Sequence, residues 1–193
     1  MTSFYRIITA LYLGMFLAVF IIPTTPAKSN DKFVKKANYY IRWDLSDSQV
    51  TELAKWDLVV LDMEVQINSP AQLKKLKKLN PNIKILAYIT SQEIKSDTSN
   101  NWGKMRQKLA SGIPEKWYLH RAGGSKISFW PGTYMLNITE NCPIINGQRF
   151  NNYLASFVNN EILSTGYWDG VFYDNTWENV TWFSGNDVDT NYD

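Results

Sequence analysis

The sequence has very little cysteine and histidine. Its 193 residues include one cysteine, Cys142, and one histidine, His120. A single cysteine excludes an intramolecular disulfide, so Cys142 is expected to be a small packed residue. A lone histidine with no second histidine or cysteine at ligand spacing argues against a zinc site. The sequence therefore predicts no zinc centre and no cofactor.

An excess of charge is missing as well. The formal net charge is +2, and the basic cluster Lys74-Lys75 and Lys77-Lys78 is expected on a solvated helix face. Nothing in this pattern predicts nucleic-acid binding. No predicted strand is followed by a glycine-rich phosphate loop, which argues against a nucleotide-binding module on an open parallel sheet.

Aromatic residues, by contrast, are abundant, with 8 tryptophans and 11 tyrosines. A large core would explain them. A carbohydrate site would explain them equally well, because sugar rings stack on aromatic rings that keep a polar edge in water. Composition leaves both interpretations open.

The first thirty residues resemble an export signal. Arg6 precedes an apolar run from Ile7 to Ile22, and the run is followed by the small, helix-breaking segment Pro23–Ala27. We interpret residues 1–28 as a signal peptide or an uncleaved N-terminal anchor, which would be the only membrane contact. Either way the protein is expected to be secreted or held at the cell surface.

From Lys35 onward, strand-like and helix-like segments alternate. A loop over Ser96–Gly132, rich in tryptophan and glycine, is expected to cover the active face and to hold one short helix around Lys104–Ala110. Strands are predicted at Ala37–Trp43, Trp56–Glu64, Ile83–Ser91, Tyr134–Ile138 and Gly166–Asn175, and helices after Ser46, after Ser69-Pro70 and over Gln148–Leu163.

This alternation predicts an α/β protein with a parallel sheet and right-handed crossovers. A closed (β/α)8 TIM barrel typically takes about 250 residues. Residues 35–193 are therefore expected to form the N-terminal part of such a barrel, truncated after about the fifth strand.

Acidic residues follow the predicted strands. Because the carboxyl ends of parallel strands meet at one rim, these acids are expected to lie together: Asp44, Asp62, Glu64, Glu93 and Asp174. Structural roles remain open for single members, such as helix capping by Asp44 or pairing of Asp62 or Glu64 with Arg42. The period of two places Gly170, Phe172 and Asp174 on one side of the last strand, which we assign to the barrel interior.

Several carboxylates at one rim suit glycoside hydrolysis, which typically uses two. The predicted catalytic residues are Asp174, Glu93 and Asp62. The predicted substrate contacts are Tyr40, Arg42, Trp43, Tyr88, Trp130, Asn175, Trp177 and Glu178. The run Asp189–Asp193 has oxygen ligands at alternate positions, which leaves open the start of a calcium loop or a polar turn.

Longer motifs add a resemblance. The segments are Tyr39–Asp44, Trp56–Asp62, Lys84–Ile89 with Glu93, Trp130-Pro131-Gly132 and Gly166–Asp174. Together they resemble the glycoside-hydrolase-like barrel proteins of the hypothetical glycosyl hydrolase family 15 type. These are similar in turn to glycoside hydrolase family 114, the endo-α-1,4-polygalactosaminidases.

The resemblance implies a (β/α)8 barrel that cleaves α-linked galactosamine-containing or related polysaccharides. It implies that Asp174 is the nucleophile and that Glu93 matches the acid closing the third strand. The usual proton donor of such barrels comes from a later strand that this sequence does not contain. The alternative is a non-catalytic carbohydrate-binding barrel at the cell surface.

Overall fold

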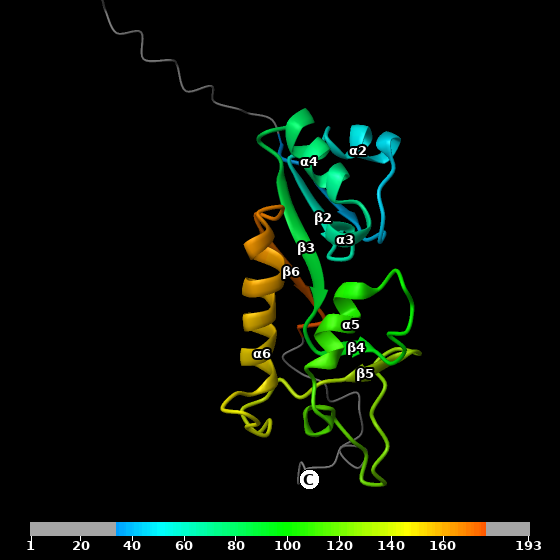
Figure 1. The fold of residues 1–193 in the computed structure, drawn as a ribbon, viewed down its shortest axis with the longest axis vertical. Coiled ribbons are helices and arrows are strands. Elements are labelled where there is room, and N and C mark those ends of the chain that lie inside the picture. Colours follow the sequence, from blue (N-terminus) through cyan, green and yellow to red (C-terminus); the bar gives the residue numbers. More distant parts are fainter. Residues whose placement is uncertain (1–33, 177–193) are drawn as a thin grey trace, which may run out of the picture. The chain divides into compact units, whose positions relative to one another are not determined.

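The computed structural model describes residues 34–176 (Figure 1). The predicted signal segment 1–28, the predicted contacts Trp177 and Glu178, and the run Asp189–Asp193 lie outside the described residues.

The fold is built on a four-stranded sheet. Its strands are β1 (Ala37–Tyr40), β2 (Leu58–Asp62), β3 (Lys84–Thr90) and β6 (Gly170–Asp174). They follow the order β1-β2-β3-β6, and every neighbouring pair is parallel. The predicted α/β class and parallel sheet are confirmed, and the carboxyl ends of these four strands meet at one edge.

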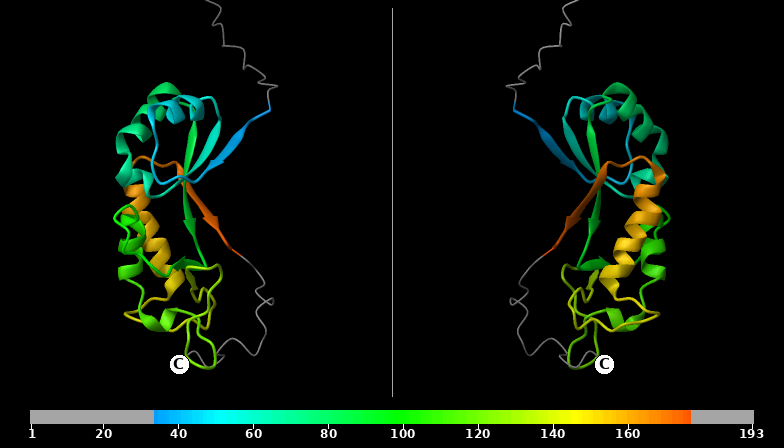
Figure 2. Two further views of the ribbon diagram at one scale, coloured as in Figure 1. Left: turned by 90° about the vertical axis from the view of Figure 1, so that its right-hand side faces the viewer. Right: turned by 90° about the vertical axis from the view of Figure 1, so that its left-hand side faces the viewer.

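The helices cover one side of this sheet. They are α2 (Asp47–Leu53), α3 (Val65–Asn68), α4 (Pro70–Leu79), α5 (Lys104–Ser111) and α6 (Phe150–Phe157). A π-helical segment, Val158–Ile162, and a 3-10 turn, Leu163–Thr165, extend α6, and a further 3-10 turn spans Glu115–Trp117. Figure 2 shows the helices on one side of the sheet, and within residues 34–176 no helix covers the other side.

Local sequence explains where the helices begin. Ser46 and Gln49 form a reciprocal capping box at the start of α2. Pro70 begins α4, where its missing N–H is not needed. Three leucines of α4 are spaced by three residues; Leu73 and Leu76 are buried, but Leu79 is 51 % exposed. Residues spaced by three drift about 60° per step around a helix, so the third member leaves the buried face.

The core lies between the sheet and the helices. Val59 and Leu61 of β2 and Ile85 and Ala87 of β3 are fully buried and face this layer. Burying such aliphatic side chains stabilises the fold by about 1.5–3 kcal/mol each. Together they fix which face of the sheet the helices cover.

The opposite face of the sheet is lined by aromatic residues. Alternation along the strands places Tyr39, Tyr88 and Phe172 there, together with Asp62 and Asp174. The rings of Tyr88 and Phe172 are stacked with centroids 6.4 Å apart, and Tyr39 meets both edge-on. The prediction that Gly170, Phe172 and Asp174 share one side is confirmed.

The predicted fourth strand is placed elsewhere. The residues around Tyr134 form β5 (Thr133–Met135), which pairs antiparallel with β4 (Glu93–Lys95) in a separate two-stranded sheet. As a result β6 lies directly beside β3 and is the fourth parallel strand, so its expected place as the fifth was wrong. A period-two pattern over three residues cannot distinguish a parallel partner from an antiparallel one.

Other boundaries also shift. The first strand ends at Tyr40 rather than Trp43, and residues predicted as the end of the second strand lead into α3. The short helix expected near Lys104 is confirmed as α5. No helix between residues 34 and 176 combines the length and apolar character needed to cross a membrane.

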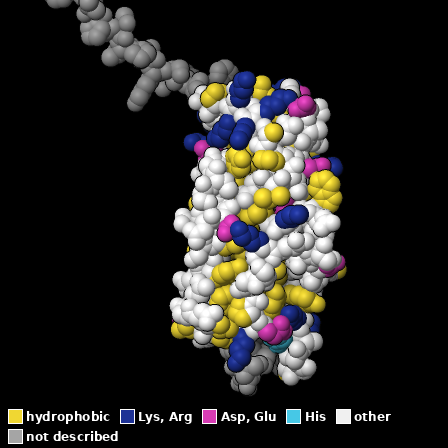
Figure 3. Space-filling view, in the orientation of Figure 1, with side chains coloured by type: hydrophobic (Ala, Val, Ile, Leu, Met, Phe, Trp, Pro, Cys, Tyr) yellow, Lys and Arg dark blue, Asp and Glu magenta, His cyan; other side chains and the backbone are white. Residues whose placement is uncertain are grey.

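The basic side chains of α4 gather on the surface near that helix (Figure 3). Lys75 donates to Asp47 at 2.7 Å, and Lys77 donates to Asp169 at 2.5 Å. Half of the four lysines are therefore already paired with acids.

Candidate active site

The candidate site lies at the carboxyl edge of the parallel sheet. A pocket of about 270 Å³ opens there. Its lining comes from strand ends, from β4 and β5, and from α5: Ile41, Trp43, Asp62, Met63, Tyr88, Thr90, Glu93, Ile94, Lys95, Arg106, Leu109 and Thr133.

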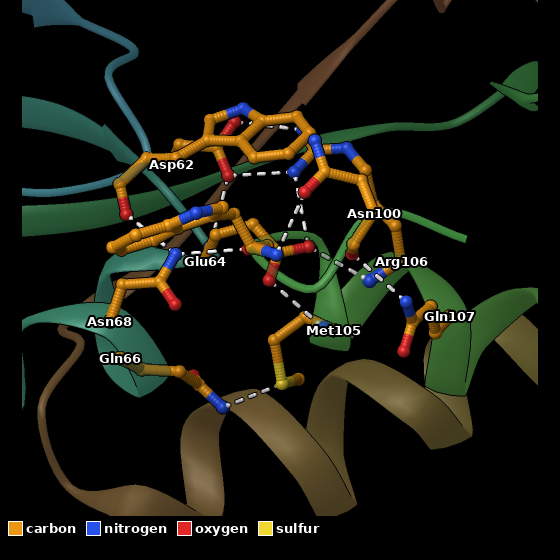
Figure 4. Close-up of polar contacts among 10 residues, drawn as sticks. Asp62, Glu64, Gln66, Asn68, Asn100, Met105, Arg106 and Gln107 are labelled. Carbon is orange, nitrogen blue, oxygen red and sulfur yellow. Dashed lines mark hydrogen bonds and ion pairs between the residues drawn. The ribbon is translucent and has the colours of Figure 1, made fainter. Parts of the chain in front are cut away.

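A buried ion-pair cluster forms one wall of the pocket (Figure 4). Arg106 of α5 donates through Nη1 and Nη2 to the two carboxylate oxygens of Asp62, at 2.8 and 2.7 Å. Arg106 also lies 3.3 Å from Glu64. The side chains of Arg106, Asp62 and Glu64 are 12 %, 2 % and 0 % exposed. Removing charges from water is costly, so each carboxylate depends on this guanidinium.

The side chain of Glu64 also caps the N-terminus of α5. Its two oxygens accept the backbone N–H groups of Met105 and Arg106, each at 2.9 Å. A carboxylate at a helix N-terminus satisfies free donors and complements the helix dipole. Burial raises the pKa of Glu64, and these two backbone donors partly oppose that rise. Glu64 therefore fixes where α5, and with it Arg106, meets the sheet.

Asp174 ends β6 beside this pocket. Tyr88, which does line the pocket, donates its hydroxyl to Asp174 Oδ2 at 2.8 Å. The backbone N–H of Asn175 donates to Asp174 Oδ1 at 2.8 Å. Burial raises the pKa of Tyr88, and the hydrogen bond to Asp174 raises it further, so Tyr88 remains a donor. Both oxygens of this half-buried carboxylate are thus oriented.

Asn175 connects Asp174 to Glu93. It adopts a left-handed backbone conformation with φ 55°, which asparagine tolerates better than most residues but at some cost. Its side-chain amide donates to Glu93 Oε1 at 2.7 Å. One residue therefore touches both acids, and Glu93 Oε1 and Asp174 Oδ1 are at most about 10 Å apart by standard covalent dimensions.

Glu93 itself is buried, at 6 % exposure. Burial raises the pKa of Glu93, the hydrogen bond from the Asn175 amide opposes this rise, and nearby Asp174 raises the pKa further. The Thr133 hydroxyl donates to the Trp130 carbonyl at 2.9 Å, so within the described chain Glu93 Oε2 has no donor of its own. An uncompensated buried oxygen favours the protonated acid.

Trp43 forms the outer wall of the pocket between two cations. Lys95 Nζ lies 4.8 Å from its ring centroid, and Arg106 Cζ lies 4.7 Å from it. Such contacts are attractive by about 0.5–2 kcal/mol. Since Arg106 is held by Asp62, the ion pair also positions Trp43.

The predicted residues fall into two groups. Trp43, Asp62, Tyr88 and Glu93 line the pocket, and Asn175 bridges Glu93 and Asp174, as described above.

Tyr40, Arg42 and Trp130 lie apart from this pocket. Tyr40 points to the helix-covered side and lines a separate pocket against α2, because it alternates with Tyr39. Arg42 is 66 % exposed and pairs loosely with Asp44 at 4.0 Å, so the pairing with Asp62 or Glu64 that the sequence left open does not form. Trp130 is 54 % exposed and packs edge-on against Phe129.

Sequence reasoning missed Arg106. The signal was present, because Arg106 lies in the short helix of the loop that was expected to cover the active face. Two acids, Asp62 and Glu64, follow the second strand and need a buried cation.

No group of three or more histidine, cysteine, aspartate or glutamate side chains within residues 34–176 could hold a metal ion. The chain matches the family model described as "Hypothetical glycosyl hydrolase family 15" over residues 77–193. This match includes Tyr88, Glu93, Arg106 and Asp174. No curated protein matches the chain.

Proposed function

Because the chain belongs to hypothetical glycosyl hydrolase family 15, we propose that it hydrolyses glycosidic bonds of a polysaccharide, with Asp174 and Glu93 as the two working carboxylates. The observation that carries this proposal is the Asn175 bridge between them. Carboxyl groups in glycosidases lie about 5 Å apart for retention and up to about 9.5 Å apart for inversion. The bridged pair is compatible with this range.

Asp174 is assigned as nucleophile or base. It is the more accessible of the two acids, and Tyr88 and the Asn175 N–H fix the orientation of both its oxygens. A nucleophile or base must be held within reach of the sugar carbon or of its attacking water.

Glu93 is assigned as the acid. A proton donor near neutral pH needs a raised pKa, and burial supplies that direction for Glu93. Glu93 Oε2 accepts no hydrogen bond within the described chain, because Asn175 donates to Oε1, so a proton can be carried on Oε2 without the loss of an existing hydrogen bond.

Asp62 is assigned a positioning role. Its Oδ1 accepts from Arg106 and from the Glu64 backbone N–H at 2.9 Å, and its Oδ2 accepts from Arg106. With both oxygens occupied by a bidentate guanidinium, Asp62 holds Arg106 and thereby Trp43 rather than attacking substrate.

The proposed architecture is a wall of a (β/α)8 barrel. Barrel sheets have helices on the outer face alone, whereas doubly wound sheets have them on both. The sequential strand order and the one-sided helices support the barrel. The proposed substrate is an α-linked galactosamine-type polysaccharide met outside the cytoplasm, as the family resemblance and the N-terminal segment imply.

The test measures reducing ends released from soluble α-1,4-galactosaminan and from a panel of other polysaccharides. Asp174→Asn is expected to fold as the parent does but to release sugar at least about a hundredfold more slowly. Asp97→Asn, an exposed aspartate outside the site, is the matched control and should keep the parent rate. Undiminished hydrolysis by Asp174→Asn would overturn the assignment.

The second candidate is a carbohydrate-binding barrel without catalysis. It is favoured by one observation, that Asp174 already accepts a hydrogen bond on each oxygen. In that case the parent chain would bind polysaccharide without releasing reducing ends, and Asp174→Asn would change affinity alone.

A further inference from the structure

A second pocket adjoins the candidate active site. It measures about 250 Å³ and is lined by Trp43, Asp44, Asn100 and Trp102. Trp43 also lines the first pocket, so its side chain is the shared wall between the two. The second pocket is smaller than the roughly 300–1,000 Å³ of sites that enclose drug-sized ligands, and so suits a single ring.

The two tryptophans are held in place by one side chain. The amide of Asn68, in α3, donates to the carbonyl of Trp43 at 3.0 Å and to the carbonyl of Trp102 at 2.9 Å (Figure 4). Trp43 and Trp102 are 25 and 34 positions from Asn68 in the chain. Preorganisation of this kind lowers the entropy cost of binding.

The rings themselves differ in availability. Lys95 and Arg106 both lie against the ring of Trp43. Trp102, in contrast, is 57 % exposed. A large exposed aromatic on a fixed backbone is costly to leave in water, and its face is suited to stacking against the C–H groups of a sugar.

Polar groups flank the exposed ring. Asn100 Oδ1 accepts from the backbone N–H of Trp102 at 2.9 Å, which leaves the side-chain amide nitrogen Nδ2 of Asn100 to donate to a ligand. Gln107 and Gly103 both donate to the Asn100 carbonyl at 2.9 Å, so this residue is also fixed. The Asp44 carboxylate is 58 % exposed and can accept. A donor and an acceptor beside an aromatic face match the hydroxyls of a pyranose.

We propose that Trp102, Asp44 and Asn100 form a sugar subsite that binds a pyranose unit of the polysaccharide next to the one held in the active-site pocket. Trp102 stacks on the ring, and Asn100 and Asp44 engage its hydroxyls. This inference rests on the proposed function and extends it. The substrate must then be at least two units long and must cross Trp43.

Binding is measured by native gel electrophoresis in gels that contain soluble α-1,4-galactosaminan, chitosan or polygalacturonate. All variants are made in the Asp174→Asn chain, so that no probe is degraded. Trp102→Ala is expected to lower the affinity for the polysaccharide, read from the retardation in the gel, about tenfold. Trp102→Phe should keep most of the affinity because a ring remains to stack on the sugar. Ile144→Ala, which removes a side chain 61 % exposed in another loop, is the control and should match the parent.

Any of three results would overturn the subsite. The Asp174→Asn chain could be retarded by no probe, the added Trp102→Ala could leave its retardation unchanged, or the added Ile144→Ala could reduce retardation as much as Trp102→Ala does. Failure of the proposed function looks different. The chain with Asp174 intact would then release no reducing ends while Trp102 still governed retardation.

Discussion

The guanidinium of Arg106 binds both oxygens of Asp62, and its Cζ lies 4.7 Å from the centroid of the Trp43 ring. This places one long side chain between a buried acid at the end of β2 and the aromatic wall of the site. The pocket is therefore shaped by an ion pair rather than by apolar packing alone. Geometry of this kind is sensitive to the loss of a single charge.

Replacing Arg106 should destabilise the fold strongly. Arg106→Met leaves Asp62 and Glu64 buried without their cation, and we expect a loss of about 3–5 kcal/mol in the free energy of unfolding, measured by urea denaturation. Lys104→Met, on the exposed side of the same helix, should change it by less than about 0.5 kcal/mol. Adding Asp62→Asn to Arg106→Met should recover part of the loss. A loss below about 1 kcal/mol for Arg106→Met would contradict the buried ion pair.

Glu93 should make stability depend on pH. Its pKa is raised in the folded protein by burial, so the folded state binds the proton more tightly than the unfolded state does. Its contribution to stability is then full below the unfolded pKa and is lost as pH rises through the folded pKa. Glu93→Gln, which mimics the protonated acid, should therefore gain stability relative to the parent as pH rises above the unfolded pKa of about 4.3. The free energy of unfolding is measured for both proteins across this pH range. A difference between Glu93→Gln and the parent that stays constant as pH rises would contradict the prediction.

Asn175 combines backbone strain with a contact to Glu93. Asn175→Ala loses the hydrogen bond and places alanine at φ 55°, whereas Asn175→Gly loses the hydrogen bond alone. We expect Asn175→Gly to be the more stable of the two by about 1 kcal/mol, measured by thermal unfolding.

Asn146 provides the matched control for that comparison. It has φ 52° in an exposed turn followed by Gly147. Asn146→Gly should be close to neutral, while Asn175→Gly should cost about 1–3 kcal/mol for the lost bond to Glu93. Equal costs at both positions would mean that the Asn175–Glu93 contact adds no stability.

Tyr88 should matter for catalysis more than for stability. Tyr88→Phe keeps the ring contacts with Tyr39 and Phe172 but removes the donor to Asp174. We expect kcat/KM to fall about tenfold to a hundredfold. Tyr153→Phe loses a hydroxyl bond of the same 2.8 Å length to the backbone carbonyl of Leu109, and because Tyr153 does not line the active-site pocket this variant should keep the parent kcat/KM. Equal losses for both variants would argue against a role of Tyr88 in the reaction.

Much of the sheet was predictable from local pattern. The continuously apolar run Leu58–Leu61 fits a strand whose helix-facing residues are fully buried, and that run is β2. The end of α4 before Asn80 fits the turn-forming residues Asn80-Pro81-Asn82, and Asn80 donates to the carbonyls of Ala54 and Trp56. Such signals are read within a few residues and need no knowledge of distant partners.

The site was less predictable because its contacts span long separations. Asp62 meets Arg106 44 residues later, and Glu93 meets Asn175 82 residues later. Pairing of Arg42 with the acids of β2 was left open by the sequence, but that side chain is 66 % exposed. A buried acid pairs with whichever cation the folded chain brings next to it. The distance between the two residues in the sequence does not predict that partner.

The sequence alone therefore determined the α/β alternation, the four parallel strands and the acids that follow them, because these depend on short-range hydrophobic period and turn chemistry. The tertiary structure alone decided that the strand at Tyr134 leaves the sheet, that β6 lies beside β3, and that Arg106 holds Asp62. Those outcomes depend on which distant surfaces bury each other and on which buried charges must be paired.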